Sequence, residues 1–172
     1  VPGSLLYYDV PKGIEWTVDK DELVQGKVVP GAAPAGLVDA HPGTIALRTR
    51  IEARDLRVRA SVRLPASGRA GVIVRWRDER NWLRLSVQPG AAGVAATVFL
   101  DQAADGVFKQ VANAPWVVAA TGNCDVEVLC WQDIAVVVVD GAVLYSAAVV
   151  NARAGRVGCY TWLAEGAARF VR

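Results

Sequence analysis

The sequence has little of what common catalytic and metal sites require. His41 is its only histidine, so a histidine-based triad or a zinc site would need unusual ligands. The motifs Gly-x-Ser-x-Gly, His-Glu-x-x-His and Cys-x-x-Cys are all missing. Methionine is absent, even from position 1, as we expect of a processed product or an excised domain. The missing motifs argue against the usual serine-hydrolase and zinc chemistries.

Long apolar runs and a large excess of charge are missing too. No stretch approaches the ~20 apolar residues of a membrane-spanning helix, and the first residues lack the basic and apolar segments of a signal peptide. The formal net charge of +2 does not imply attraction to nucleic acid. A hydrophobic content of 53% argues against disorder. We therefore expect one domain over residues 1–172, large enough to bury a core without disulfides or metal, and neither a nucleic-acid nor a membrane partner.

Cysteine is scarce, and its count of three is odd, which leaves at least one thiol unpaired. Cys124 and Cys130 fall in one predicted strand, too far apart along it for a disulfide. Cys130 and Cys159 have no such obstacle, so a bond between them stays open. We favour buried free thiols at all these positions.

What the sequence does contain is alternation of period two, which is clearest from Gly71 to Val87. Alternation of this kind is typical of a half-buried strand, because successive side chains point to opposite faces of the sheet. The first strand has Val72, Val74 and Trp76 on one side, against Ile73, Arg75 and Arg77. After a turn at 78–81, Leu83, Leu85 and Val87 alternate with Trp82, Arg84 and Ser86. The pattern predicts a hairpin with one apolar face and one face that carries arginines and a tryptophan.

Similar short segments follow one another through most of the chain, and none shows sustained helical periodicity. Residues 1–43 are rich in proline and glycine turns, so we expect only short or edge strands there, with Trp16 in the core. Asp140-Gly141 is a strong hairpin signal, because both central residues of such a turn need positive φ. The predicted strands cover residues 44–52, 56–64, 94–100, 107–111, 124–131, 134–139, 142–149, 155–163 and 169–172. Many short strands separated by turns predict an all-β protein, a sandwich or a barrel.

Three groups of residues together resemble a known superfamily. They are Gly71, Val74, Arg75, Asp78, Asn81, Trp82 and Leu85 in the hairpin, then Val139-Asp140-Gly141, then Gly155 to Gly158. The order resembles the concanavalin A-like lectin/glucanase jelly roll, in its laminin G-like and keto-disaccharide-hydrolase-like branches. The resemblance covers about residues 56–172 and implies a two-sheet antiparallel jelly-roll sandwich whose concave sheet often holds a carbohydrate. Trp82 stands where the family usually has tyrosine, and the last strand of the family pattern is cut short.

The catalytic and metal-binding features of this superfamily are not found. Laminarinase-type members use a Glu-x-Asp-x-x-Glu strand that places acid and nucleophile on one face, whereas Asp125 and Glu127 here lack the third carboxylate. Laminin G-like domains often bind calcium, but the loop aspartates of this chain form no dense cluster. We therefore predict no catalytic residues, no metal and no cofactor, calcium being the one that the resemblance would allow.

The positive signal is a set of arginines on alternating positions. Arg57, Arg59 and Arg63 share one side of their strand, and short connections favour neighbouring strands, so these arginines would converge with those of the hairpin. Guanidinium groups bind carboxylate or sulfate, and a tryptophan offers a platform for a sugar ring. The predicted ligand-binding residues are Arg59, Arg63, Arg75, Arg77, Trp82 and Arg84. In the alternative, Arg75 is structural and the others pair with Glu52, Asp101, Asp125 and Glu127, which would stabilise the fold little.

The segment Ile134 to Val139 is apolar on both faces. Either both faces are buried within the domain, or the segment docks against a neighbouring domain or a protein partner. Exposed as an edge strand, it would be an aggregation hazard, so we expect it to be covered.

Three functions fit these observations. The one we predict is a non-catalytic, lectin-like module that binds a glycan, with an anionic one allowed, on the arginine and tryptophan face. It would belong to a larger assembly, with an extracellular or cell-surface location favoured. The alternatives are a structural or adaptor domain, and a hydrolase or lyase that acts on a sugar derivative. The fold by itself does not choose among them, because such sandwiches host all three.

Overall fold

Every regular element in the described part of the chain is a β-strand. The computed structural model describes residues 8–9, 16–19, 22–25, 43–119, 122–150, 152–165 and 168–171. Its strands are β1 (Tyr8–Asp9), β2 (Trp16–Asp19), β3 (Glu22–Gln25), β4 (Thr44–Ala53), β5 (Leu56–Arg63), β6 (Ser67–Asp78), β7 (Asn81–Gln88), β8 (Ala96–Ala104), β9 (Val107–Trp116), β10 (Asn123–Trp131), β11 (Ile134–Val139), β12 (Ala142–Ala148), β13 (Gly155–Glu165) and β14 (Ala168–Val171). No helix long and apolar enough to span a bilayer occurs among these residues.

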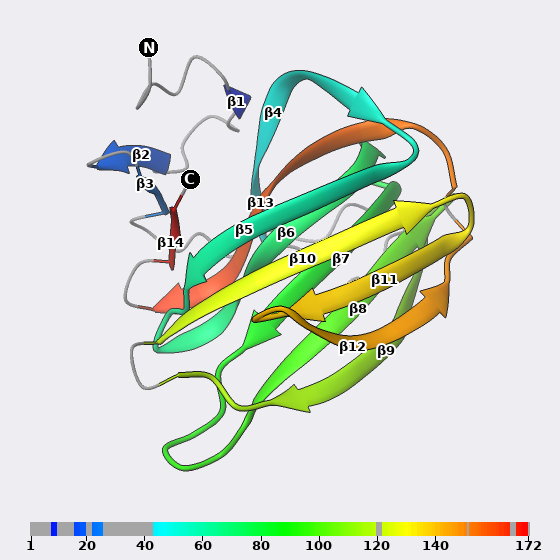
Figure 1. The fold of residues 1–172 in the computed structure, drawn as a ribbon. Coiled ribbons are helices and arrows are strands. Elements are labelled where there is room, and N and C mark those ends of the chain that lie inside the picture. Colours follow the sequence, from blue (N-terminus) through cyan, green and yellow to red (C-terminus); the bar gives the residue numbers. More distant parts are fainter. Residues whose placement is uncertain are drawn as a thin grey trace.

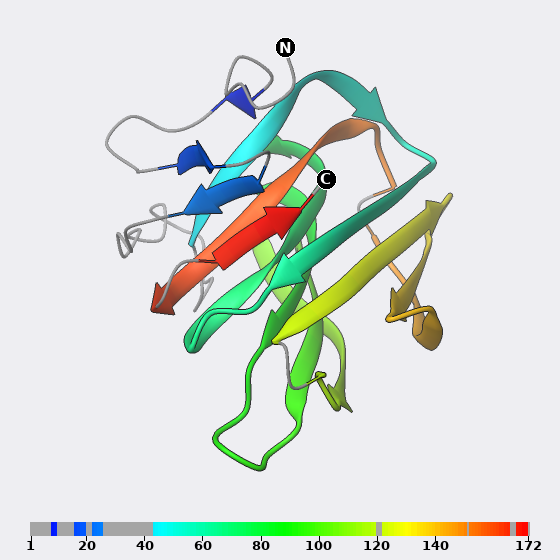
Figure 2. The same cartoon turned by 60° about the vertical axis from the view of Figure 1, so that its left-hand side comes forward.

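The strands form two seven-stranded sheets that pack face to face (Figure 1). Sheet A has the order β1-β4-β13-β6-β7-β8-β9, and sheet B the order β12-β11-β10-β5-β14-β3-β2. Every pairing between these strands is antiparallel. Figure 2 shows β14 lying beside β5 in one layer and β13 beside β4 in the other. The two-sheet antiparallel sandwich predicted from the sequence is confirmed.

Turn residues set the hairpins where the sequence predicts them. Asp140 and Gly141 have φ of 47° and 82° between β11 and β12, as a two-residue turn with positive φ requires. In the β6–β7 turn, Asp78 Oδ1 accepts hydrogen bonds from the Arg80 backbone N–H at 2.8 Å and from Asn81 Nδ2 at 3.0 Å. These local bonds fix the register of each hairpin, and with it the face on which every following side chain lies.

The main core lies between the sheets and is built from alternate residues of both. Trp16 lies in it, with its ring centroid 6.0 Å from that of Phe170, which confirms the predicted role of this tryptophan. The valine and leucine side chains of this core with at most 1% exposure are Val72, Val74, Leu83, Leu85, Val87, Val98, Leu100, Val62, Val126, Val128, Val137 and Val139. Burial of these side chains is the main stabilising term of a sandwich of this kind.

Strand β11 is covered on one face only. Ala135, Val137 and Val139 lie in the core, and β12 pairs with β11, so the segment is not an edge strand. The other face is less protected, because Ile134 remains 48% exposed. Of the two alternatives, burial of both faces of Ile134–Val139 within the domain is therefore wrong for the outward face, and docking of that face against a partner stays a prediction.

A second apolar cluster covers the face of sheet A that points away from sheet B, which we call the outer face of sheet A. Its buried members are Leu47, Ile73, Trp82, Ala103 and Tyr160, with Ile45, Trp76, Phe108 and Trp162 packed against them. Gly43 lies against this cluster, where a Cβ atom would come within 2.4 Å of the Tyr160 ring. The sequence pattern placed Trp76 on the inner side with Val74, and this is wrong, because the backbone is irregular at Arg75.

The three strands expected to lie side by side do not. Strands β6 and β7 are neighbours in sheet A, but β5 lies in sheet B between β10 and β14. The short connection from β5 to β6 does not join neighbouring strands of one sheet. It crosses from sheet B to sheet A at an end of the sandwich. This exchange lets Val62 of β5 and Val72 of β6 both reach the core between the sheets. The predicted convergence of their arginines is therefore wrong.

The three cysteines are free, so the bond left open between Cys130 and Cys159 is not formed. Burial raises the pKa of Cys130 to about 11 and those of Cys124 and Cys159 to about 12, because a buried thiolate loses its solvation.

We expect all three thiols to resist alkylation in the folded protein at mildly alkaline pH, because the thiolate is the reactive species. Titration with a chromogenic disulfide should detect no fast-reacting thiol before guanidinium chloride is added and three afterwards. A thiol that reacts at once in the native protein would contradict the burial described here.

Candidate functional site

The six residues predicted to bind a ligand lie in three separate places. Arg59 and Arg63 belong to β5 and sheet B, whereas Trp82 and Arg84 lie on the outer face of sheet A. Arg75 and Arg77 come near the end of β6, with Arg75 buried and Arg77 exposed. Of these six residues, the structure brings only Trp82 and Arg84 into one buried cluster.

Arg75 ties together two turns at one end of the sandwich. Its φ is 51°, and the β6–β7 register shifts after Val74, so the side chain turns inward and is fully buried. Its Nε donates to the Arg54 carbonyl at 2.8 Å and its Nη2 to the Gln132 carbonyl at 2.7 Å, with Asp55 at 3.8 Å. The guanidinium is thus placed to hold the β4–β5 and β10–β11 turns, which supports the structural alternative for this residue.

The β5 arginines lie on the face of sheet B that points away from sheet A. Arg57 Nη2 donates to Glu127 Oε2 at 2.9 Å. Arg59 and Ser61 both donate to the Asp125 carboxylate, and these two hydrogen bonds lower its pKa. Both arginines remain more than half exposed. The pairing with Asp125 and Glu127 foreseen as the alternative is confirmed, and pairs this exposed stabilise the fold little.

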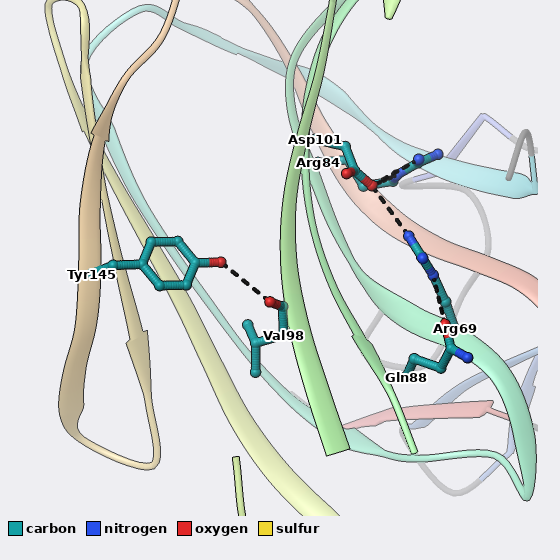
Figure 3. A network of polar contacts seen from close by, with 6 residues as sticks. All are labelled: Arg69, Arg84, Gln88, Val98, Asp101 and Tyr145. Carbon is teal, nitrogen blue, oxygen red and sulfur yellow. Dashed lines mark hydrogen bonds and ion pairs between the residues drawn. The ribbon is translucent and has the colours of Figure 1, made fainter. Parts of the chain in front are cut away.

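Arg84 lies at the centre of a buried polar cluster on the outer face of sheet A (Figure 3). Its Nη2 and Nε lie 2.9 Å and 3.3 Å from Asp101 Oδ2. The same oxygen accepts from Arg69 Nη1 at 3.4 Å, and Arg69 Nε donates to Gln88 Oε1 at 3.1 Å. Arg84, Asp101 and Arg69 are each at most 5% exposed. We call these three residues and Gln88 the Asp101 cluster.

The strand register explains why these side chains meet. Arg84 on β7 is directly opposite Asp101 on β8, so both project from the same face at adjacent positions. Arg69 starts from β6, on the far side of β7, and its guanidinium stacks 3.7 Å from the centre of the Phe99 ring on β8. The Arg69 side chain therefore spans β7.

Aromatic rings surround the Asp101 cluster. The Arg84 guanidinium lies 4.6 Å from the ring centre of Trp82 and 4.4 Å from that of Tyr160. Trp82 in turn packs against Phe108 with ring centroids 6.2 Å apart. Cation–π contacts of this kind strengthen when they are desolvated, so the rings stabilise a charged group that would otherwise be costly to bury.

Two polar atoms of this face have no hydrogen-bond partner. Asp101 Oδ1 and Ser86 Oγ are both buried and unpaired. Ser86 is opposite Phe99, and Arg84 is opposite Asp101, so the two atoms belong to neighbouring rows of the same face. A buried polar atom without a partner costs roughly 1–3 kcal/mol, which makes such atoms natural contacts for a ligand or a water molecule. The carboxylate oxygen needs a donor, and the serine hydroxyl can donate or accept.

The face is more open toward the edge strand β9. Gln110 is opposite Asp101, and Asn113 is opposite Phe99, so both side chains point to the outer face, where they are exposed. Phe99 itself is only partly buried. A molecule that approaches from this edge would meet amide groups first and the Asp101 cluster behind them.

Sequence reasoning found half of this arrangement. Trp82 and Arg84 were predicted, and Asp101 was foreseen only as an ion-pair partner. Arg69 and Ser86 were missed as site residues. Arg69 lies two residues before Gly71, so extending the alternation of β6 backwards by one step would have placed it on the face of Arg84.

No metal site is found among the residues that the structure describes. They contain no group of three or more histidine, cysteine, aspartate or glutamate side chains able to hold an ion. The Asp78 carboxylate accepts a hydrogen bond within the β6–β7 turn. The Asp140 carboxylate accepts hydrogen bonds from Trp116 Nε1 at 2.8 Å and from the Asp125 backbone N–H at 2.7 Å. His41 lies outside the described residues.

Compared by sequence with known proteins, the chain matches no family model and no curated protein. Compared by structure, it is similar to the carbohydrate-binding module CBM66 from Bacillus subtilis, with a TM-score of 0.73 and 13% identity over 96% of this chain and 92% of that one. A protein of unknown function with a galectin-like fold from Bacillus subtilis has a TM-score of 0.66 and 10% identity, covering 95% and 86% of the two chains. For xylan beta-1,4-xylosidase from Bacillus halodurans C-125 the TM-score is 0.62 and the identity 14%, over 87% of this chain but only 31% of the enzyme.

At these identities the likeness establishes the architecture and nothing finer. The chain is an all-β sandwich of the galectin-like and concanavalin A-like type. This confirms the fold that the resemblance implied, while membership of the superfamily and of its laminin G-like and keto-disaccharide-hydrolase-like branches stays a prediction.

Proposed function

We propose that the chain is a non-catalytic carbohydrate-binding module that takes a hydroxyl-rich glycan on the outer face of sheet A. The observation that carries the proposal is the pair of buried, unpartnered atoms Asp101 Oδ1 and Ser86 Oγ within a ring of aromatic side chains. A sugar supplies what both atoms need, because each hydroxyl can donate and accept and each ring has an apolar face. The fold supports the proposal, since it is shared with a carbohydrate-binding module.

The chemistry of the unpaired atoms favours a neutral sugar over an anionic one. A carboxylate or sulfate has no proton to donate to Asp101 Oδ1 and would be repelled by its charge. The guanidinium of Arg84 already bonds the other oxygen of the same carboxylate. The anionic ligand suggested by the arginine count is therefore the less suitable of the two.

A route to the buried atoms follows from the position of Arg69. Its side chain spans β7, and its contact with Asp101 is the longest in the cluster at 3.4 Å. A sugar that enters from the β9 edge would displace the Arg69 side chain and form hydrogen bonds with Asp101 and Ser86. The exposed amides of Asn113 and Gln110 would contact the part of the sugar that faces solvent. In the displaced position, the guanidinium of Arg69 would bond a sugar hydroxyl in place of the Asp101 carboxylate.

Catalysis is not part of the proposal. Glycoside hydrolysis uses two carboxyl groups on either side of the scissile bond, and the Asp101 cluster holds one. That one is fully buried and bonded to two guanidinium groups, and no second carboxyl group of the described residues faces it across a space for a scissile bond.

Replacing Ser86 by alanine should weaken glycan binding by about 10-fold, because one hydrogen bond of about 1 kcal/mol or slightly more is lost. The same change should leave the thermal midpoint unchanged or slightly higher, since the hydroxyl has no partner in the free protein. A glycan array identifies the tightest neutral ligand, and calorimetric titration with that glycan compares the two proteins.

The matched control is Ser61→Ala, which removes a hydroxyl from the opposite sheet that bonds Asp125. It should not alter glycan affinity. The proposal is wrong if the wild-type protein binds no glycan on the array, or if Ser86→Ala binds as tightly as the wild type.

A further inference from the structure

The face of sheet B that points away from sheet A takes no part in the proposed glycan site. Strands β5, β10, β11 and β12 lie side by side on it (Figure 1). Together they line a shallow hollow of about 350 Å³, which we call the sheet B hollow. It is on the opposite side of the sandwich from the Asp101 cluster, so what it binds can be tested separately.

Strand register fixes the layout of the hollow. One row runs straight across it from β5 to β12 and contains Arg59, Glu127, Val138 and Val143. Leu129 and Val136 are opposite each other and lie two residues along the strands from Glu127 and Val138. Asp125 lies two residues from Glu127 in the opposite direction. Arg57 lies opposite Leu129, so the half of the hollow nearer β5 is charged and the half nearer β12 is aliphatic.

The charged half is balanced within itself. Arg57 pairs with Glu127, and Arg59 pairs with Asp125, which leaves two cations and two anions on the surface. The arginine side chains are 68% and 62% exposed, whereas the acids lie lower, at 9% and 33%. Because both signs occur on the same patch, the surface that best complements it is another copy of itself.

The aliphatic half is open to solvent. Val143 is 69% exposed, and Leu129, Val136 and Val138 are partly exposed beside it. Contiguous apolar surface next to charged side chains is typical of a protein interface. A glycan fits the hollow less well, because both of its arginines are already paired with carboxylates.

We propose that a second copy of this chain packs on the sheet B hollow about a two-fold axis, with the strands of the two sheets crossing at roughly a right angle. Sheets pack face to face either nearly aligned or nearly orthogonal, and the crossed arrangement is the one that matches the charges here.

The charges match across this axis. From the midpoint between Glu127 and Val138, Arg59 lies one and a half strand spacings away, about 7 Å across the strands. Asp125 lies two residues from the same row, also about 7 Å, but along the strands. Because the distances are equal and the directions perpendicular, the axis brings Arg59 of each copy over Asp125 of the other. The two intramolecular pairs then join into one network of alternating charge.

The apolar residues match across the same axis. Val143 lies one and a half strand spacings from the midpoint on the side away from Arg59. Leu129 and Val136 lie about 7 Å along the strands, on the side away from Asp125. The axis therefore places Val143 of each copy between Leu129 and Val136 of the other. Burial of these side chains would stabilise the dimer.

Sedimentation velocity over a range of protein concentrations tests the proposal. The wild-type chain should sediment as a dimer that dissociates on dilution. Val143→Asp should raise the dissociation constant at least about 10-fold, since it buries an unpaired charge in each half of the interface. The matched control is Val107→Asp on β9, because Val107 is 70% exposed but belongs to sheet A and lies outside the hollow. This variant should remain dimeric.

A charge swap tests the predicted pairing itself. Arg59→Glu alone should also raise the dissociation constant of the dimer at least about 10-fold, because it places a negative charge over Asp125 of the other copy. Adding Asp125→Arg to the same chain restores opposite charges and should restore the dimer. The thermal midpoint of each variant confirms that it is folded.

Three results would overturn the proposal. They are a wild-type monomer at every concentration, a Val143→Asp protein that dimerises like the wild type, and dissociation caused by Val107→Asp. Glycan titration of the same variants keeps the two proposals apart, because Val143→Asp should bind the glycan of sheet A with unchanged affinity per chain.

Discussion

Replacing Asp101 by alanine is expected to destabilise the fold by about 3–5 kcal/mol, the cost of removing one partner from a buried ion pair. Asp101 is fully buried, and its Oδ2 atom is shared by Arg84 and Arg69. Without the carboxylate, two guanidinium groups would remain close together at the centre of the outer face of sheet A. Urea unfolding followed by tryptophan fluorescence measures the loss, and Asp101→Asn should recover part of it by keeping a hydrogen-bond acceptor.

The exposed pair on the other sheet provides the control for Asp101. Arg59 and Asp125 are also joined by a hydrogen bond, but the Arg59 side chain is 62% exposed. Measured in dilute protein, Arg59→Ala should leave the urea midpoint almost unchanged, because solvent screens the pair. If the two variants lost equal stability, burial would not be what makes the Asp101 cluster costly to break.

Replacing Arg75 by alanine should cost about 3 kcal/mol or more, since the side chain satisfies two backbone carbonyls and fills the space between two turns. The β4–β5 turn connects sheet A to sheet B and the β10–β11 turn lies within sheet B, so loss of both contacts should loosen one end of the sandwich. Arg75→Lys keeps the charge but not the planar fork, and should fall between alanine and the wild type. Hydrogen exchange at the β4–β5 and β10–β11 turns locates the effect.

Arg77 is the matched control for Arg75, because it lies two residues further along the same strand and is exposed. Arg77→Ala should change the unfolding midpoint within the error of measurement, as most surface substitutions do. An Arg75→Ala protein as stable as Arg77→Ala would show that the contacts to the two turns do not stabilise the fold.

The turns and the in-out pattern of most strands were predictable, because they depend on neighbouring residues. Asp140-Gly141 specifies its hairpin by the positive φ it tolerates. Leu83 and Leu85 alternate with Trp82 and Arg84 in the structure as they do in the sequence. Alternation reports which side chains share a face, and it did so correctly wherever the strand is regular.

Which sheet a strand joins was not predictable from alternation. The valines of β5 and β6 alternate in the same way, although the two strands lie in different sheets. The prediction also failed at Arg75, where a positive φ interrupts the strand, turns this side chain inward and moves Trp76 to the opposite face. The Asp101 cluster depends on both kinds of information, so the sequence indicated its residue types but not their assembly.

The place of β13 has a consequence for how the chain reaches this fold. β13 lies between β4 and β6 and pairs with both, although it begins 102 residues after β4 ends and 77 residues after β6 ends. Sheet A therefore cannot close until β13, which is synthesised well after β4 and β6, inserts between them. Contacts of such high sequence separation pay a large loop-closure entropy first, which places this protein among slow folders, on a scale of about milliseconds to seconds. During synthesis, the facing edges of β4 and β6 must wait unpaired for the strand that joins them.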